Sequence, residues 1–167
     1  MLFRILRALL RLAAIVTVSL LLQMIWLTGK RLFPRQSLLR RKFRQFILVS
    51  WARALAWLVG MRIVVEGEPP QPPFFLVANH LSYIDIILIA SRMDCVFIAK
   101  KEISAWPGMG WLAEGIGTIF IDRKNFQDIS RVIGLIDEAL SEGSGVVLFP
   151  EGTSSMGETV LPFSPAL

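Results

Sequence analysis

An uncharged apolar run near the amino terminus limits what this chain can fold into. Residues 12–29 (LAAIVTVSLLLQMIWLTG) contain no charged side chain, although 19% of the 167 residues are charged. Such a run lies at the short end of the length that spans a hydrocarbon core of roughly 30 Å. The rest of the chain reads as a globular sequence, long enough for one domain with a core. We therefore expect a membrane-anchoring helical segment over residues 1–65 and a globular domain over residues 66–167.

Cationic residues flank the apolar run on both sides and contribute to a net charge of +5. They are Arg4, Arg7 and Arg11 before it, and Lys30, Arg31, Arg35, Arg40, Arg41, Lys42 and Arg44 after it. Basic clusters beside an apolar segment are typical of contacts with anionic lipid, each worth on the order of 1 kcal/mol near the surface. Because no nucleic-acid-binding motif accompanies them, we expect membrane lipids and no nucleic acid as partners.

A secretory signal peptide is the alternative interpretation of this amino terminus. We favour a retained anchor, because the run is longer than a usual signal core and no small-x-small cleavage site follows. The basic stretch after it would also resist translocation. The single cysteine, Cys95, excludes an intramolecular disulfide and is typical of a reducing compartment. We therefore expect the protein at the cytoplasmic face of a bacterial inner membrane.

A second apolar stretch covers residues 43–65. It carries three arginines spaced nine apart, with two tryptophans between the first and the last: Arg44, Arg53 and Arg62, and Trp51 and Trp57. This pattern suits an interfacial helix with arginines that reach toward water. We expect the two apolar stretches to form a helical hairpin bound to one leaflet. A single true span, and an ordinary buried helix over residues 43–60, are the alternatives.

Four prolines at residues 69–73 mark a linker, and the character of the sequence changes after it. Short apolar runs predict strands at residues 74–78, 95–99, 118–121 and 145–149. Helices are predicted between them at residues 82–91, 104–115 and 125–141, the second interrupted by Pro107-Gly108. The last helix has one apolar face, formed by Ile129, Val132, Ile133, Ile136 and Leu140. This alternation predicts an α/β fold with a largely parallel sheet flanked by helices.

Polar residues follow each of the four predicted strands. They are Asn79-His80, Lys100-Lys101, Asp122-Arg123 and Glu151-Gly152-Thr153. Ligand sites in parallel sheets gather at the carboxyl ends of the strands. We therefore expect these four clusters to converge on one crevice.

His80 is the only histidine of the chain, and Asp85 follows five residues later in the first turn of a predicted helix. An aspartate there can accept a hydrogen bond from one ring nitrogen, which fixes the tautomer and leaves the other nitrogen as a base. The alternatives are a structural histidine and an aspartate that only caps the helix. Ser82 lies at capping-box spacing from Asp85.

The sequence offers this base no convincing protein nucleophile. Cys95 begins an apolar strand, so we expect it in the core, and Ser82 is expected to cap a helix. The base is therefore expected to act on a substrate hydroxyl directly. One histidine argues against a His-rich metal site, and Asp85, Asp122 and Glu151 lack a supporting spacing for a carboxylate site, so we predict no metal and no cofactor.

The segment 149–153 (FPEGT) and the basic residues near it predict an anion site. Gly152 permits close backbone approach, so that its amide and a neighbouring one can receive an anion or a developing oxyanion. Glu151 either orients a substrate hydroxyl or accepts structural hydrogen bonds. The basic rim suits phosphate recognition, with a solvated rim as the alternative. It consists of Lys100, Lys101, Arg123 and Lys124.

Three blocks of this sequence together resemble the glycerolipid acyltransferase family, whose archetype is 1-acylglycerol-3-phosphate acyltransferase. Residues 79–85 (NHLSYID) match its N-H-x-x-x-x-D block, residues 117–123 (GTIFIDR) its second and residues 149–153 (FPEGT) its third. The resemblance covers residues 74 to the end. The basic amino-terminal hairpin also resembles the membrane-binding element of the family.

The resemblance implies that His80 deprotonates an acceptor hydroxyl, which attacks the thioester of acyl-CoA or acyl-carrier protein. Asp85 orients His80, and no acyl-enzyme forms. The implied acceptor is a lysophospholipid, by default 1-acylglycerol-3-phosphate (lysophosphatidate), with Arg123 holding its phosphate. The other implied substrate-binding residues are Asn79, Ser82, Lys100, Glu151, Gly152 and Thr153.

Two departures from the family pattern qualify this expectation. Ser154 stands where the third block commonly has an arginine, which favours other acceptors such as lyso-ornithine lipid. The chain also ends at Leu167, where the family continues with further strands and a fourth block, so we expect an incomplete domain. A thioesterase-like hydrolase and a non-catalytic, membrane-anchored lipid-binding protein are the alternatives to acyl transfer.

Overall fold

The computed structural model describes residues 1–34, 36–154 and 157–163, so that Arg35 and Ser155 lie outside the described residues. The chain divides into two compact units. Met1–Glu68 and Ile87–Arg92 form the helical unit, and Pro69–Ile86 and Met93–Leu167 form the sheet unit. The predicted division into domains after residue 65 stays a prediction.

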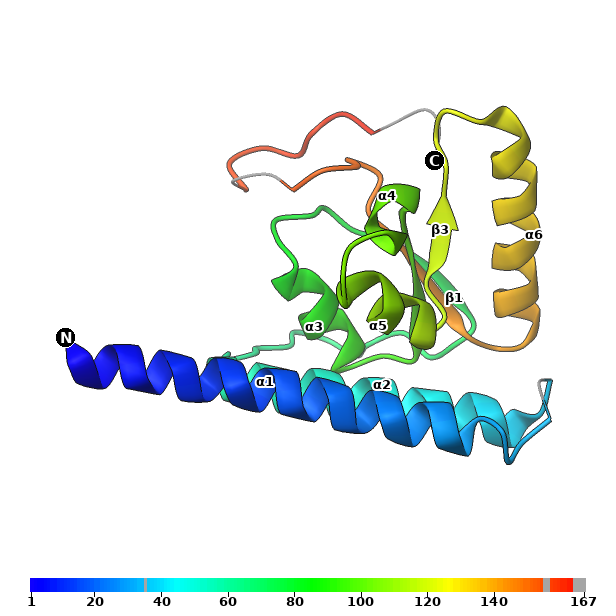
Figure 1. Ribbon diagram of the computed structural model, residues 1–167. Coiled ribbons are helices and arrows are strands. Elements are labelled where there is room, and N and C mark those ends of the chain that lie inside the picture. The colour runs from blue at the N-terminus through cyan, green and yellow to red at the C-terminus, as the bar shows by residue number, and fades with distance from the viewer. Residues whose placement is uncertain (35, 155–156, 164–167) are drawn as a thin grey trace. The chain divides into compact units, whose positions relative to one another are not determined.

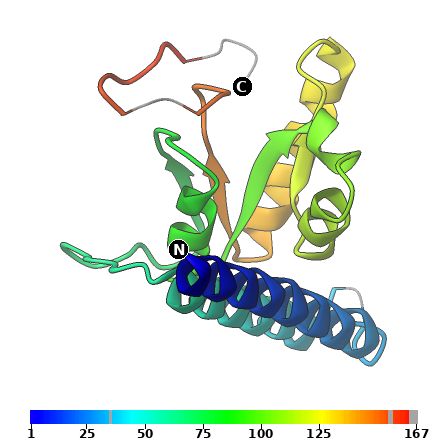
Figure 2. The same cartoon turned by 60° about the vertical axis from the view of Figure 1, so that its left-hand side comes forward.

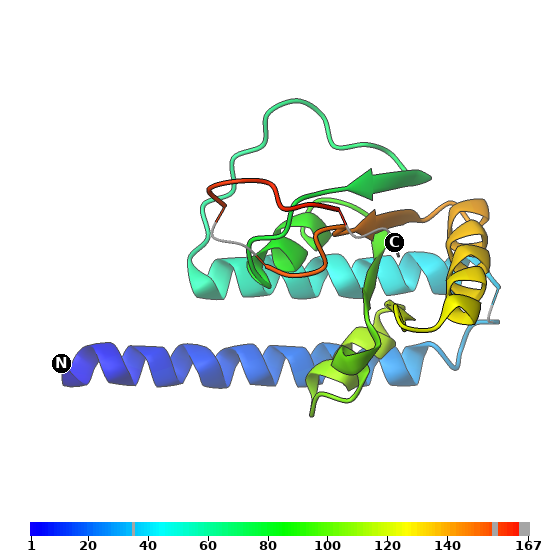
Figure 3. The same cartoon turned by 90° about the horizontal axis from the view of Figure 1, so that it is seen from above.

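Two long helices that run side by side in opposite directions build the helical unit (Figure 3). They are α1 (Leu2–Gly29) and α2 (Leu38–Val59). The buried residues of α1 are three or four positions apart, and therefore share one face. They are Ser19, Gln23, Trp26 and Gly29. The predicted helical hairpin is thus present, while its binding to a membrane stays a prediction.

Specific contacts join the two helices. The indole Nε1 of Trp51 donates to the hydroxyl of Ser19 at 2.9 Å. The ring centroids of Trp26 and Phe43 lie 5.8 Å apart, and a side chain at Gly29 would overlap the Phe43 ring. Trp51 therefore packs within the hairpin, whereas the sequence pattern predicted it as an interfacial aromatic.

The bounds of α2 differ from the predicted stretch 43–65 because capping residues fix them. The Ser37 hydroxyl accepts a hydrogen bond from the Arg40 amide at 3.2 Å, and this N-cap starts the helix earlier. Gly60, with a φ of 83°, ends it. Arg62 therefore lies beyond the helix, and Arg53 donates from Nε to the Ser91 carbonyl at 3.1 Å, so these two arginines do not form the predicted row of water-reaching side chains along one helix.

Within the described part of the chain, α1 is the one helix whose length and composition would allow it to cross a membrane. It has 28 residues, and most of its apolar side chains are exposed.

A parallel sheet of four strands in the order β1-β4-β2-β3 forms the centre of the sheet unit. The strands are β1 (Phe74–Val77), β2 (Cys95–Lys100), β3 (Ile119–Ile121) and β4 (Gly145–Leu148). Each predicted strand is confirmed to within one residue. Since β4 lies between β1 and β2, the segment that follows β4 emerges between those that follow the first two strands.

Four helices follow or connect these strands (Figure 1). They are α3 (Ile84–Ala90), α4 (Lys101–Ser104), α5 (Met109–Gly115) and α6 (Phe126–Ser141). The helix predicted at residues 104–115 is present only after Pro107 and Gly108, as α5, while the short helix α4 ends at Ser104, where the predicted helix was to begin. The predicted α/β fold with helices beside a parallel sheet is confirmed.

Helix α6 packs against β3 and β4 (Figure 2). Its Val132 is buried in a cluster with residues of three strands: Val96, Ile98, Ile119, Ile121, Val146 and Leu148. Leu135, Ile136, Ala139 and Leu140 of the helix pack against this cluster. Ile133 is exposed, so its predicted place on the apolar face was wrong; Leu135 and Ala139 lie on that face instead.

Candidate functional site

His80 and Asp85 form a hydrogen-bonded pair directly after β1. The ring Nδ1 of His80 lies 2.9 Å from Oδ2 of Asp85, and both side chains are largely buried. Because a carboxylate only accepts hydrogen bonds, this contact places the proton on Nδ1. The lone pair is then on Nε2, which is the arrangement that a general base needs.

The same carboxylate oxygen shapes the loop that carries the histidine. Oδ2 of Asp85 also accepts from the amides of Leu81 and Ser82, at 2.7 and 2.9 Å. The Ser82 hydroxyl accepts from the amide of Ile84 at 3.2 Å, so it forms a local turn instead of completing a reciprocal capping box. One oxygen of Asp85 therefore both orients the ring and supports the start of the helix, whereas the sequence left open an aspartate that only caps the helix.

Aromatic rings fix the plane of the imidazole. His80 stacks on Phe149 with centroids 4.2 Å apart and planes 23° apart, and Phe149 lies 6.4 Å from Phe97. The ring of Tyr83 meets His80 edge-on at 6.5 Å. The sequence pattern indicated no role for Phe149 of its own. Its position at the end of a predicted strand was a signal that it lies near the site, but its stacking on His80 depends on β4 lying next to β1, which only the tertiary structure shows.

Glu151 joins the third sequence block to the first. It is buried, and its Oε2 accepts from the backbone amide of His80 at a long 3.5 Å, while its Oε1 accepts from the amide of Leu161 at 3.2 Å. These contacts are those of a structural acceptor that supports the backbone at His80. A direct role of Glu151 toward a substrate hydroxyl stays a prediction.

Arg123 and Gly152 join the second block to the third. Gly152 has a φ of 68°, and a side chain there would collide with the guanidinium of Arg123. Nε of Arg123 is buried and has no hydrogen-bond partner among the residues described. Burial lowers the pKa of Arg123 below its ordinary value, and the negative charge of Glu102 opposes this shift. A partly buried guanidinium whose buried Nε donor is unused suits an anionic ligand.

The amide of Gly152 is engaged within its own turn. It donates to the carbonyl of Phe149 at 3.1 Å. This bond engages the N–H that the sequence pattern assigned to an anion, and a role of Gly152 in binding an anion or a substrate stays a prediction. The anion site that the geometry supports is at Arg123.

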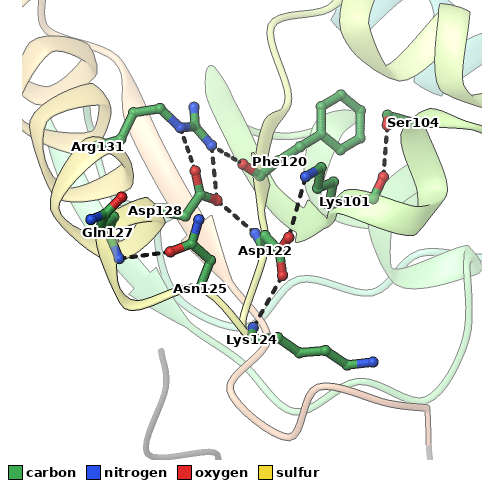
Figure 4. A network of polar contacts seen from close by, with 9 residues as sticks. All are labelled: Lys101, Ser104, Phe120, Asp122, Lys124, Asn125, Gln127, Asp128 and Arg131. Carbon is green, nitrogen blue, oxygen red and sulfur yellow. Dashed lines mark hydrogen bonds and ion pairs between the residues drawn. The ribbon is translucent and has the colours of Figure 1, made fainter.

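The remaining predicted residues lie at the same edge of the sheet. Lys101 pairs with Asp122 at 3.2 Å, and Lys124 extends away from this pair (Figure 4). Asn79 and Thr153 are exposed after β1 and β4, Lys100 is the exposed last residue of β2, and the roles of all three in substrate binding stay predictions. No group of three or more metal-ligating side chains occurs among the residues of known placement.

Comparisons with known proteins fit this geometry. The sequence profile of the acyltransferase family matches residues 62–167. A lyso-ornithine lipid O-acyltransferase of Rhizobium meliloti is 36% identical over 127 residues, which are 75% of this chain and 44% of that protein. A 1-acyl-sn-glycerol-3-phosphate acyltransferase of Neisseria gonorrhoeae is 34% identical over 149 residues, which are 86% of this chain and 57% of that protein.

A solved structure is similar over nearly the whole chain. The crystal structure of the 1-acyl-sn-glycerophosphate acyltransferase of Thermotoga maritima aligns with a TM-score of 0.72 and 26% identity. The alignment covers 97% of this chain and 68% of that one. The chain spans about half the length of the curated relatives that it matches.

Proposed function

Because this chain belongs to the acyltransferase family, as its three sequence blocks predicted, we propose that the protein moves a fatty acyl group from a thioester to the hydroxyl of a lyso-lipid. The bond between His80 Nδ1 and Asp85 carries this proposal, since it leaves Nε2 as the base. The thioester is that of acyl-CoA or of acyl-carrier protein.

The reaction is direct transfer. Nε2 of His80 takes the proton of the acceptor hydroxyl as its oxygen bonds to the thioester carbonyl carbon. The tetrahedral intermediate then expels the thiolate as the carbon–sulfur bond breaks, and the imidazolium returns the proton to sulfur. Asp85 stabilises that imidazolium by charge. Cys95 is fully buried in β2, which supports a mechanism without an acyl-cysteine.

Lysophosphatidate is the default acceptor in this proposal. The guanidinium of Arg123, with its unused buried Nε, supports recognition of a phosphate. Relatives named 1-acyl-sn-glycerol-3-phosphate acyltransferase support the same acceptor.

Lyso-ornithine lipid is a second candidate acceptor with support of its own. Relatives of that name are 36 to 38% identical to this chain. Ser154 also removes a cation that a phosphate would use, because the family commonly has an arginine there.

We also propose that the α1–α2 hairpin holds the protein at the cytoplasmic face of a bacterial inner membrane. The exposed apolar side chains of α1 and the basic residues beside them support this placement. Both acyl-bearing substrates partition to such a surface.

An acceptor panel tests the proposed reaction. Full-length protein in mixed micelles is given acyl-CoA or acyl-carrier protein together with lysophosphatidate or lyso-ornithine lipid, and thiol release and acylated product are measured. His80→Ala should abolish transfer while the protein still sediments with vesicles. Transfer retained by that variant would refute the base assignment. Thiol release without an acceptor would favour a thioesterase, and no turnover under any condition would favour a lipid-binding protein.

A further inference from the structure

Asp122 is held at four points where β3 ends (Figure 4). Its amide donates to Oδ2 of Asp128 at 2.6 Å, and its carbonyl accepts from the amide of Asn125 at 3.1 Å. Its Oδ1 accepts from the amide of Lys124 at 3.1 Å, and its Oδ2 pairs with Lys101 at 3.2 Å. Residues 122–125 therefore form a turn whose backbone is fixed at both ends.

Asp128 supports this turn from the first turn of α6. Nε of Arg131 donates to its Oδ1 at 2.6 Å, and Nη2 of Arg131 donates to its Oδ2 at 3.1 Å. The same Nη2 donates to the carbonyl of Phe120 in β3 at 2.6 Å. Arg131 thus binds both the carbonyl of Phe120 in β3 and the carboxylate of Asp128. The same carboxylate accepts the hydrogen bond from the amide of Asp122, so it connects Arg131 to the turn. None of these contacts involves the His80–Asp85 pair.

Arg123 is the residue inside the turn. Its neighbours on both sides, Asp122 and Lys124, are tied through their amides, while its own side chain lies against the backbone of Gly152. The side chain of an arginine is long and flexible, and it loses conformational entropy when it binds an anion. Binding is therefore tighter if the protein already holds the side chain in place before the anion arrives. The fixed turn contributes to holding it in place.

We propose that Asp128, held by Arg131, is a positioning residue that fixes the 122–125 turn and so keeps Arg123 at the phosphate of the acceptor. This inference rests on the proposed function and deepens it. It assigns Asp128 to the binding of phosphate-bearing acceptors and gives it no part in the proton transfer at His80.

The test compares Asp128→Asn with Asp137→Asn, an exposed aspartate on the same helix that lies outside the contacts described above. Full-length enzyme in mixed micelles is assayed for KM and kcat with lysophosphatidate and with lyso-ornithine lipid. We expect Asp128→Asn to raise the KM for lysophosphatidate about tenfold, equivalent to about 1.4 kcal/mol. The kcat, and the KM for the phosphate-free acceptor, should change less than twofold, and Asp137→Asn should behave as wild type.

Two further variants separate positioning from folding. Arg123→Ala and the double variant with Asp128→Asn should give the same KM for lysophosphatidate, because Asp128 acts through Arg123. Additive effects, or a fall in kcat for both acceptors, would mean that Asp128 only stabilises the fold and would overturn the inference. If circular dichroism shows that Asp128→Asn is unfolded, Arg131→Gln takes its place. This variant should raise the KM for lysophosphatidate two- to fivefold. An unchanged KM would refute the inference.

The same data distinguish the inference from the proposed function. If wild type transfers no acyl group, or Arg123→Ala leaves the KM for lysophosphatidate unchanged, the proposed phosphate site fails and the inference fails with it. If Arg123→Ala raises this KM but Asp128→Asn and Arg131→Gln do not, only the inference is overturned.

Discussion

Replacement of Asp85 by asparagine changes a single oxygen that accepts three hydrogen bonds. Oδ2 of Asp85 receives Nδ1 of His80 at 2.9 Å and the amides of Leu81 and Ser82 at 2.7 and 2.9 Å. An asparagine has one oxygen and one NH₂ group of similar size but no charge. If its oxygen stays with the two amides, the imidazolium loses a counter-charge. If its NH₂ group turns to the ring, Nδ1 must accept, and the proton moves to Nε2.

Either outcome weakens the base. In serine proteases, the equivalent change from aspartate to asparagine lowers kcat about 10⁴-fold through the wrong tautomer. Asp85 is placed in the same way, so we expect a loss on the order of 10³–10⁴, or about 4–5.5 kcal/mol at 1.36 kcal/mol per tenfold. Neutralising an acceptor of charge-assisted bonds should also lower the free energy of unfolding by about 1–3 kcal/mol.

Initial rates of thiol release at saturating donor and acceptor measure the loss in kcat, and a thermal melt in the same micelles measures stability. Asp137→Asn, the same chemical change at an exposed position, is the control. The acceptor KM should stay within about threefold of wild type. A folded Asp85→Asn protein with a kcat within tenfold of wild type would refute the tautomer argument.

Three other changes test the packing and charge around the site. Gly152→Ala places a methyl group against the guanidinium of Arg123 and strains a backbone with a φ of 68°, so the KM for lysophosphatidate should rise and the free energy of unfolding should fall by about 1–2 kcal/mol. Gly145→Ala overlaps the ring of Phe74 in the neighbouring strand, and denaturant titration should show a loss of about 1–3 kcal/mol. Arg131 lowers the pKa of Asp128 to about 2, chiefly by hydrogen bonding, so this carboxylate stabilises the fold above about pH 4 and the effect is lost as the pH falls toward 2. The stability of wild type should therefore drop more steeply over that interval than that of Asp128→Asn.

Gly134→Ala serves as the control for the glycine variants. Gly134 lies within α6, and an added methyl group would meet nothing within 4 Å. Alanine in an exposed helix should stabilise the protein by roughly 0.5–1 kcal/mol. A loss of stability in this variant comparable to that of Gly145→Ala would show that the Phe74 overlap is not the cause.

Local features of the site could be predicted from the sequence alone. His80 and Asp85 are only five residues apart, so a strand end followed by a helix start is enough to bring them together. The strands themselves were recognisable because each is a short apolar run ended by polar residues. The helix predicted at residues 125–141 is present as α6, and Asn125 is its N-cap, whose side chain accepts from the amide of Gln127 at 3.0 Å.

Contacts between residues that are far apart in the sequence could not be predicted from the sequence pattern. Glu151 reaches His80 across 71 positions only because β4 lies between β1 and β2. Periodicity reports that a residue has a buried face, but it does not report which neighbour covers that face. For this reason the sequence pattern predicts an interfacial Trp51, whereas the indole donates a hydrogen bond to Ser19 within the hairpin.

The amino-acid sequence by itself therefore determined the strands and helices, the His80–Asp85 pair and the edge of the sheet where the polar residues gather. These depend on interactions within a few residues and on the general geometry of parallel sheets. The tertiary structure alone decided the strand order, the stacking of Phe149 on His80 and the meeting of Arg123 with Gly152. Those contacts depend on which segments pack side by side, because their partners are far apart in the chain.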